Sequence, residues 1–354
     1  MFGFERRLRR EPGIPLALCA AVLFGASTPL AKVAISSANP LLVAGLLYLG
    51  SGIGLFIVRS NRSGRAPETP LSRADLPWLG WSVLAGGVVG PALLLLGLMN
   101  TSASAASLLL NLEAVATAAL AWIVFRENVD KRVGTGFALI LLGGVFLSLP
   151  PEGGFVLSEG ALLIAAACVS WGIDNNLTRK ISGSDPSQIA MWKGLVAGFV
   201  NISLALAIGA KLPALSTILA VAAIGFAGYG VSLVLFVRAL RHLGSARTGA
   251  YFSTAPFVGT ALAFAIGQGR LDWAFCAAGI LMSIGVWLHV TERHEHLHVH
   301  EPLEHEHLHY HDEHHQHEHS PSDPPGEPHA HRHRHALLRH AHPHYPDIHH
   351  RHEH

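Results

Sequence analysis

Residues 24–32 read FGASTPLAK, and a related stretch, WGIDNNLTR, occupies residues 171–179. Each stretch opens with an aromatic residue and a glycine, and each has a basic residue seven positions after that glycine. The second stretch begins 147 residues after the first. Later in the chain Val129-Asp130 matches Leu271-Asp272, and there the matching residues are 142 positions apart. Self-similarity over so long a period predicts a chain built from two copies of one unit.

Long apolar runs fill both copies. Half of the 354 residues are apolar and only 14% are charged, whereas average soluble chains are about 25% charged. A membrane-spanning helix needs about 20 mostly apolar residues, so these runs predict an all-α membrane protein and exclude a soluble enzyme. The ten expected transmembrane helices are 14–35, 40–58, 78–99, 103–125, 133–149, 159–178, 187–209, 215–238, 248–266 and 272–290.

Each copy contains five of the expected helices. An odd number of spans per copy places the second copy upside down in the membrane, which is the inverted-repeat architecture of many secondary transporters. The expected organisation is a basic cytoplasmic N-terminus at 1–13, a first repeat at 14–149, an external linker at 150–158, a second repeat at 159–290 and a tail at 291–354.

The basic residues between the spans predict the orientation of the chain. If both termini are cytoplasmic, sixteen Lys and Arg residues lie on the cytoplasmic side, and only Lys211 and Arg270 lie outside. Cytoplasmic loops of membrane proteins carry such an excess of positive charge. We therefore expect a multi-pass protein of the bacterial inner membrane with both termini in the cytoplasm. The sixteen residues are Arg6, Arg7, Arg9, Arg10, Arg59, Arg62, Arg65, Arg73, Arg126, Lys131, Arg132, Arg179, Lys180, Arg238, Arg241 and Arg247.

Three further stretches resemble the EamA-type family of drug/metabolite transporters, as does FGASTPLAK. They are LLLNLEAV at 108–115, FRENV at 125–129 and the glycine-spaced helix at 134–148. The chain departs from the family pattern at Ala114, where the family has proline, and at Ala255, where it has glutamate. The resemblance covers about residues 14–290 and implies transport of small molecules such as amino acids, drugs, sugars or nucleosides.

Glu113 is an ionisable residue near the centre of an expected membrane helix. Ionisable groups in the membrane cost several kcal/mol unless they are paired or hydrated, so each is a functional candidate. Glu113 would suit proton-linked transport or a cationic group of the substrate. Alternatively, it forms a hydrogen bond that holds two helices together.

Asp174 and Lys193 are expected at similar depths near the cytoplasmic ends of neighbouring helices. Paired, they would form an inner gate or the floor of a substrate cavity, with Trp171 and Asn175 as lining; the alternative is a static buried ion pair. Asn111, Tyr251 and Thr254 add polar groups near the middle of corresponding helices in the two halves. A small-ligand site needs such polar groups in one apolar cavity.

Small-residue spacings occur at Gly50-x3-Gly54, Gly86-x3-Gly90 and Gly194-x3-Gly198. They predict close helix packing, with formation of a homodimer as an alternative. Lys32 lies near the end of its helix, where its side chain would reach the headgroups.

The tail differs from the rest of the chain. Residues 294–354 hold 23 of the 25 histidines and have a net charge of −7. Proline, charge and low apolar content predict disorder. Imidazole binds Zn²⁺, Ni²⁺ and Co²⁺, so the tail could buffer metal, regulate transport, deliver a metal substrate, sense pH or be inert. The candidate ligands are His294, His296, His298, His300, His305, His307, His309 and His311.

The expected function is secondary transport of a small metabolite or drug, more often outward, by alternating access. The expected partners are a small-molecule substrate and the lipid bilayer, with no nucleic acid and no required cofactor. The alternative is a metal-responsive membrane protein or a Ni, Co or Zn transporter that depends on the tail. Cys19, Cys168, Cys276 and His289 are too dispersed within the helices to form a transition-metal path.

Overall fold

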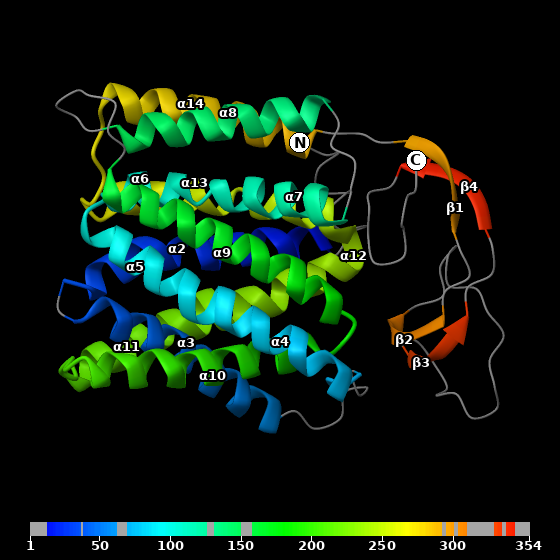
Figure 1. Ribbon diagram of the computed structural model, residues 1–354, viewed down its shortest axis with the longest axis horizontal. Coiled ribbons are helices and arrows are strands. Elements are labelled where there is room, and N and C mark those ends of the chain that lie inside the picture. The colour runs from blue at the N-terminus through cyan, green and yellow to red at the C-terminus, as the bar shows by residue number, and fades with distance from the viewer. Residues whose placement is uncertain are drawn as a thin grey trace.

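The computed structural model describes residues 13–36, 38–61, 69–125, 131–149 and 158–291, together with four short segments of the tail. Helices make up the described part of residues 13–291 and lie roughly along one direction (Figure 1). They are α2 (Gly13–Ala34), α3 (Pro40–Ser60), α4 (Leu76–Ser82), α5 (Gly90–Met99), α6 (Ala103–Leu109), α7 (Leu112–Phe125), α8 (Lys131–Ser148), α9 (Glu159–Ile181), α10 (Pro186–Ala207), α11 (Leu215–Gly225), α12 (Ser232–Phe252), α13 (Ala255–Ala265) and α14 (Trp273–Val290). A 3₁₀ turn at Arg73–Asp75 precedes α4, and π-helical segments join α4 to α5 (Val83–Val89) and α11 to α12 (Phe226–Val231).

Several helices begin where polar side chains cap the chain. Asn39 and Asp185 each precede a proline at the first helical position, and their side-chain oxygens accept hydrogen bonds from the next free N–H groups of α3 and α10. Ser102 and Ser158 cap α6 and α9 in the same manner. Proline has no N–H to satisfy at this position, so the local sequence defines these helix starts.

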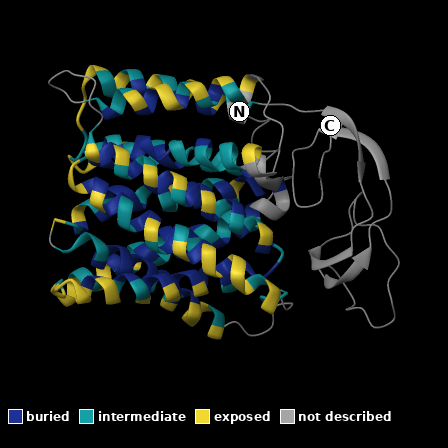
Figure 2. Cartoon of the chain, in the orientation of Figure 1, coloured by how far each residue is buried: buried dark blue, intermediate teal, exposed yellow. Residues whose placement is uncertain are grey.

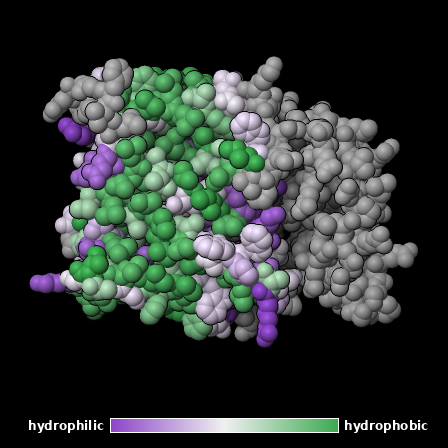
Figure 3. All heavy atoms as spheres, in the orientation of Figure 1, coloured by the Kyte–Doolittle hydropathy of each residue, from purple (hydrophilic) through white to green (hydrophobic). Residues whose placement is uncertain are grey.

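Six helical stretches within the described residues are long and apolar enough to cross a membrane. They are Gly13–Ala34, Pro40–Ser60, Arg73–Met99, Ala103–Leu120, Pro186–Ala207 and Leu215–Ala239. Three apolar helices are shorter, and α9 has 23 residues but carries more polar groups. The visible face is an apolar band with hydrophilic residues gathered at its ends (Figure 3). The prediction of an all-α, multi-pass membrane protein is therefore confirmed for the helical part, whereas the count of ten spans remains a prediction.

The helices pack as pairs around a buried centre. α8 lies beside α14 at the top of the bundle, and α3 and α10 lie together on the opposite side (Figure 1). α2 packs on α12 and α13, while α9 packs on α5 and α7. Exposed positions gather on the outer helices and buried positions in the middle (Figure 2). Exposed Phe199 and Ile123 are suited to contact with lipid, whereas Leu94 and Leu47 are fully buried.

Glycines allow the tightest helix crossings. A Cβ on Gly194 would overlap the backbone of Gly52, and one on Gly198 would lie 2.5 Å from the backbone nitrogen of Leu49. These contacts hold α10 directly against α3. Gly50 and Gly54 likewise meet the segment from α11 to its π-helical continuation. The predicted close packing is therefore found within one chain, and nothing described assigns these glycines to a homodimer.

Two expected helix boundaries are wrong. The expected helix at 103–125 is interrupted at Leu110–Asn111, where the amide of Asn111 donates to the carbonyl of Leu108 and competes with the helical ladder. The loop expected after residue 238 is helical, because α12 continues to Phe252 and the break comes just before Ala255-Pro256. Proline cannot supply the N–H that would continue the helix. The basic residues at 238–247, in contrast, are compatible with a helix.

The tail contains four strands where disorder was expected. β1 (Glu295–His300) pairs antiparallel with β4 (Leu338–Pro343), and β2 (Glu304–His309) pairs with β3 (His329–Arg334). The His-x-His alternation has the two-residue period of a strand, and pairing satisfies the backbone groups. The expectation of disorder is not confirmed for these four segments, and the remaining tail residues lie outside the described part of the chain.

We expect Gly194→Ala to lower the free energy of unfolding by about 1–3 kcal/mol, the usual cost of overpacking a close contact. The matched control is Gly183→Ala, because no atom lies within 4 Å of a Cβ at that turn. Thermal unfolding of both variants in detergent measures the difference. Equal melting temperatures for the two would show that the α3–α10 crossing is looser than the structure indicates.

Candidate functional site

A buried ion pair joins α9 to α10. The Lys193 ammonium lies 2.6 Å and 2.7 Å from the two carboxylate oxygens of Asp174 and also donates to Thr178 Oγ1 at 3.2 Å. Thr178 in turn donates to Asp174 at 2.9 Å. Lys193 and Asp174 are 3% and 6% exposed, so neither group has solvent to replace its partner. The pairing expected from their similar depth is present.

Glycine on the third span makes room for this pair. A Cβ at Gly86 would overlap the Asp174 carboxylate, and one at Gly90 would lie 2.9 Å from the indole nitrogen of Trp171. The carboxylate and the indole therefore rest directly on the backbone of Val83–Val89 and the start of α5. The Gly86-x3-Gly90 spacing, expected to serve helix packing, contacts two of the predicted site residues.

Glu113 connects to the same part of α9 through an amide. Asn175 donates to Glu113 Oε1 at 2.9 Å and to Thr117 Oγ1 at 3.1 Å, and Asn176 donates to the Thr117 carbonyl at 3.0 Å. The helix–helix hydrogen bond considered for Glu113 therefore exists between α7 and α9. Its described hydrogen-bond partner is uncharged, so a negative charge on Glu113 is not neutralised within that bond.

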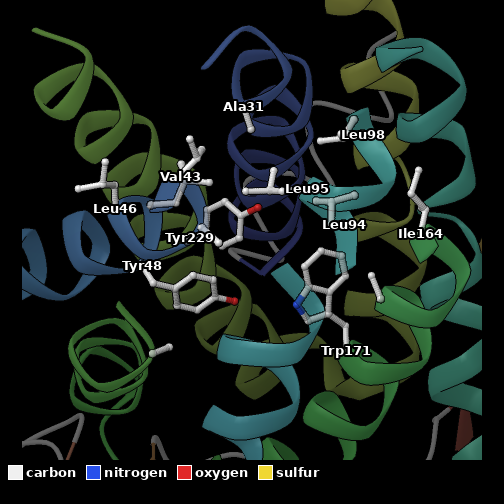
Figure 4. Packing of buried hydrophobic residues seen from close by; sticks show 14 of the residues in the cluster. Ala31, Val43, Leu46, Tyr48, Leu94, Leu95, Leu98, Ile164, Trp171 and Tyr229 are labelled. Atoms are coloured by element: carbon white, nitrogen blue, oxygen red, sulfur yellow. The ribbon is translucent and has the colours of Figure 1, made fainter. Parts of the chain in front are cut away.

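Aromatic side chains from both halves of the chain meet beside the ion pair. Phe24 lies edge-on to Trp171, with ring centroids 6.2 Å apart, and also contacts Tyr229 at 5.8 Å. Tyr229 packs against Tyr48 at 5.1 Å. The hydroxyls of both tyrosines and the indole nitrogen of Trp171 point toward the same central region (Figure 4). Trp171 is buried, whereas the chain's other six tryptophans are exposed.

The remaining three predicted site residues have their described contacts elsewhere. Asn111 lies between α6 and α7, where its amide donates to Leu108 and approaches the sulfur of Met282. Tyr251 belongs to the end of α12 rather than to the middle of the next helix, and it packs near the start of α2. Thr254 donates to the carbonyl of Tyr251 at 2.7 Å. None of these contacts includes Asp174 or Lys193.

Asp185 links the end of α3 to the start of α10. Its carboxylate accepts hydrogen bonds from the backbone N–H and the hydroxyl of Ser187, and it forms an ion pair with Arg59. Burial by itself would raise the pKa of Asp185, but the hydrogen bonds from Ser187 and Arg59 and the charge of Arg59 outweigh burial and lower the pKa. The backbone N–H of Asp185 also donates to Thr69, which attaches the loop before α4.

Sequence reasoning missed Tyr48, Thr117, Thr178, Tyr229 and the Arg59–Asp185 pair. An Asp-Pro-Ser-Gln sequence at 185–188 is a capping signal that could have located Asp185. Tyr48 and Tyr229 carried no such signal, since a lone tyrosine in an apolar run is consistent with many positions. Lys32, expected near the headgroups, donates to the carbonyl of Leu98 near the end of α5.

No group of three or more His, Cys, Asp or Glu suited to a metal occurs among the side chains that the structure describes. The predicted tail ligands are not tested by this finding. His294 and His311 lie outside the described residues, and the other six belong to β1 and β2, whose side chains are not described.

The chain was compared with known families and structures. The family profile described as the EamA-like transporter family matches residues 11–149 and 158–291. A solved crystal structure superposes with a TM-score of 0.60 over 80% of this chain and 99% of its own length. At 18% identity that likeness concerns the fold alone.

Curated relatives carry transporter names. An uncharacterized transporter of Methanothermobacter thermautotrophicus is 32% identical, over 79% of this chain and 87% of its own length. A probable amino-acid metabolite efflux pump of Salmonella typhimurium is 28% identical over 53% of this chain and 62% of its own. The uncharacterized inner membrane transporter YedA of Escherichia coli K12 is 24% identical, over 75% of this chain and 89% of its own length.

We expect Lys193→Met to destabilise the protein by about 3–5 kcal/mol, because it leaves the Asp174 carboxylate buried without its partner. The double variant Asp174→Asn/Lys193→Met should recover most of that loss, since both groups are then neutral. Lys211→Met, at an exposed position, is the control and should change stability by less than about 0.5 kcal/mol. The ion-pair interpretation would be contradicted if the loss of stability in the double variant equalled the sum of the losses in Asp174→Asn and Lys193→Met.

We expect Asp185→Ala to cost about 1 kcal/mol through loss of the cap, while Asp185→Asn keeps the cap and loses only the charge. Because the pKa of Asp185 is lower in the folded state, its charge stabilises the fold above the ordinary carboxyl pKa. That stabilisation disappears as pH falls through the folded value. Melting temperature against pH should therefore converge for wild type and Asp185→Asn at acid pH; a constant gap would refute the assignment.

Proposed function

Because the chain belongs to the EamA-like transporter family, we propose that it is a secondary transporter rather than an enzyme. It exports small metabolites or drugs across the bacterial inner membrane by alternating access. Residues 14–149 and 159–290 form two inverted five-helix repeats, and both termini are cytoplasmic. The excess of basic residues in the expected cytoplasmic segments supports this orientation. The name of the Salmonella relative supports outward transport.

One observation carries the proposal: both repeats contribute polar groups to one cluster within an apolar bundle. The first repeat supplies Glu113 and Thr117, and the second supplies Asp174, Asn175 and Lys193. Such groups are costly in hydrocarbon, and intramembrane ionisable residues generally mark substrate or ion pathways. In inverted-repeat transporters the binding site lies where the repeats meet. The proposed substrate-binding residues of this cluster are Trp171, Asp174, Asn175, Lys193 and Glu113. Asn111, Tyr251 and Thr254, whose described contacts lie elsewhere, stay predictions from the sequence.

The charges in this cluster support a role for Glu113 in proton coupling or in substrate binding. Asp174 and Lys193 neutralise each other in a direct ion pair, whereas Glu113 accepts a hydrogen bond from an uncharged amide. An ionised Glu113 leaves one negative charge in the cluster, which a proton or a cationic group of the substrate would neutralise. Glu113 therefore serves as the site at which substrate and proton compete, or as the anchor for an amine.

Metal is the alternative cargo, and it rests on the histidine-rich tail. The tail would hold Zn, Ni or Co, and the chain would then serve metal homeostasis. The described membrane helices offer no cluster of metal ligands, which favours an organic substrate. Deletion of residues 294–354 distinguishes the two functions, because it should leave metabolite transport intact and abolish a metal-dependent function.

We expect Glu113→Gln to abolish any transport that a pH gradient drives in proteoliposomes, because glutamine cannot release a proton. Glu159→Gln is the control, since Glu159 is exposed at the start of α9.

The substrate is first sought as a compound that raises the melting temperature of the full-length protein in the presence of a chelator. The panel contains amino acids and cationic drugs. It also contains Ni²⁺, Co²⁺ and Zn²⁺, which are tested without chelator. A response to metal alone, retained after tail deletion, would replace the proposed substrate class.

A further inference from the structure

The third and the eighth of the expected spans, at 78–99 and 215–238, contain the same irregularity at corresponding places. Val83–Val89 is π-helical between α4 and α5, and Phe226–Val231 is π-helical between α11 and α12. Phe226 follows Val83 by 143 residues, close to the offset of 142 that relates later parts of the two halves. A π segment disturbs the regular hydrogen-bond ladder and is a known place for a helix to bend.

Side chains from three other helices hold the first π segment. The Gly86 carbonyl accepts hydrogen bonds from the Tyr48 hydroxyl at 2.6 Å and from the Trp171 indole nitrogen at 2.9 Å. The Gly87 carbonyl accepts from Asn201 at 2.9 Å. These bonds supply the donors that carbonyls in a disturbed ladder require within hydrocarbon.

The second π segment packs on α3, the helix that carries Tyr48. The ring of Tyr229, within the segment, lies 5.1 Å from the ring of Tyr48, and Figure 4 shows the two side chains beside each other. A Cβ at Gly230 would lie 3.0 Å from Ser51 Oγ, and Phe226 lies against Gly54. Tyr48 therefore contacts one π segment through its hydroxyl and the other through its ring.

We propose that Tyr48 is a positioning residue that couples the two π segments, so that the third and eighth spans bend in one concerted step. The backbone of Tyr48 is held firmly because α3 and α10 cross at Gly52 and Gly194. A displacement of either π segment therefore moves the Tyr48 ring against the other segment. The consequence for transport rests on the proposed function, whereas the coupling itself does not.

Hydrogen exchange of the full-length protein, measured on peptides that cover 83–89 and 226–231, tests the coupling. Tyr229→Leu removes the ring that Tyr48 contacts, and we expect it to accelerate exchange at the distant segment 83–89 by about fivefold or more, as for residues in one network. In a Tyr48→Phe background, which keeps the ring and loses the bond to Gly86, Tyr229→Leu should no longer change exchange at 83–89.

Asn201→Ala perturbs the first segment independently of Tyr48, because Asn201 bonds to Gly87. It should accelerate exchange at 83–89 and, since the coupling is reciprocal, also at 226–231, and the effect at 226–231 should be absent in the Tyr48→Phe background. In transport assays, Tyr48→Phe should lower the turnover rate without raising KM. The proposal would be overturned if the effects of Tyr48→Phe and Tyr229→Leu on the exchange rate at 83–89 were additive. Because exchange is measured without substrate, that result is independent of whether the transport assignment holds.

Discussion

A carbonyl that leaves the helical ladder inside a bilayer has no water to accept from, so the protein itself must supply a donor. The π segment at Val83–Val89 places this requirement at the centre of the bundle, and Tyr48, Trp171 and Asn201 meet it at Gly86 and Gly87. Each donor belongs to a different helix. The hydrogen bonds of one irregular turn therefore fix the positions of α3, α9 and α10 around the third span.

The buried charges follow from the same arrangement. Asp174 can approach the third span because Gly86 has no side chain. Both α9 and α10 pack on the segment Val83–Val89, and there Lys193 reaches the Asp174 carboxylate. Desolvation makes either charge alone unfavourable, so the pair is stable only in this packing. A structural role and a transport role are compatible here. A gate formed by an ion pair also needs both of its charges paired when it is closed.

Parts of this site were accessible from the sequence. Asp174 and Lys193 are ionisable residues in apolar surroundings, and their depth in neighbouring helices predicted the pair. Glu113 was identified on the same ground, but its partner Asn175 was expected only as cavity lining. Tyr48 and Tyr229 were missed because the aromatic contact depends on which faces of α3 and of the π-helical segment Phe226–Val231 meet. The basic residues at 238–247 predict a loop and so misplace Tyr251, whereas α12 continues through them to Phe252.

The sequence by itself determined the class of the protein, because apolar runs of membrane length and a repeat of 142 to 147 residues are properties of the linear order. It also determined the starts of α3 and α10, since Asn39-Pro40 and Asp185-Pro186 act on their immediate neighbours. Only the tertiary structure decided which residues form the centre. Contacts such as Tyr48 to Gly86, or Asn175 to Glu113, join residues 38 and 62 positions apart. Their existence depends on helix rotation and on close approach at glycines, which hydropathy and spacing along the chain do not specify.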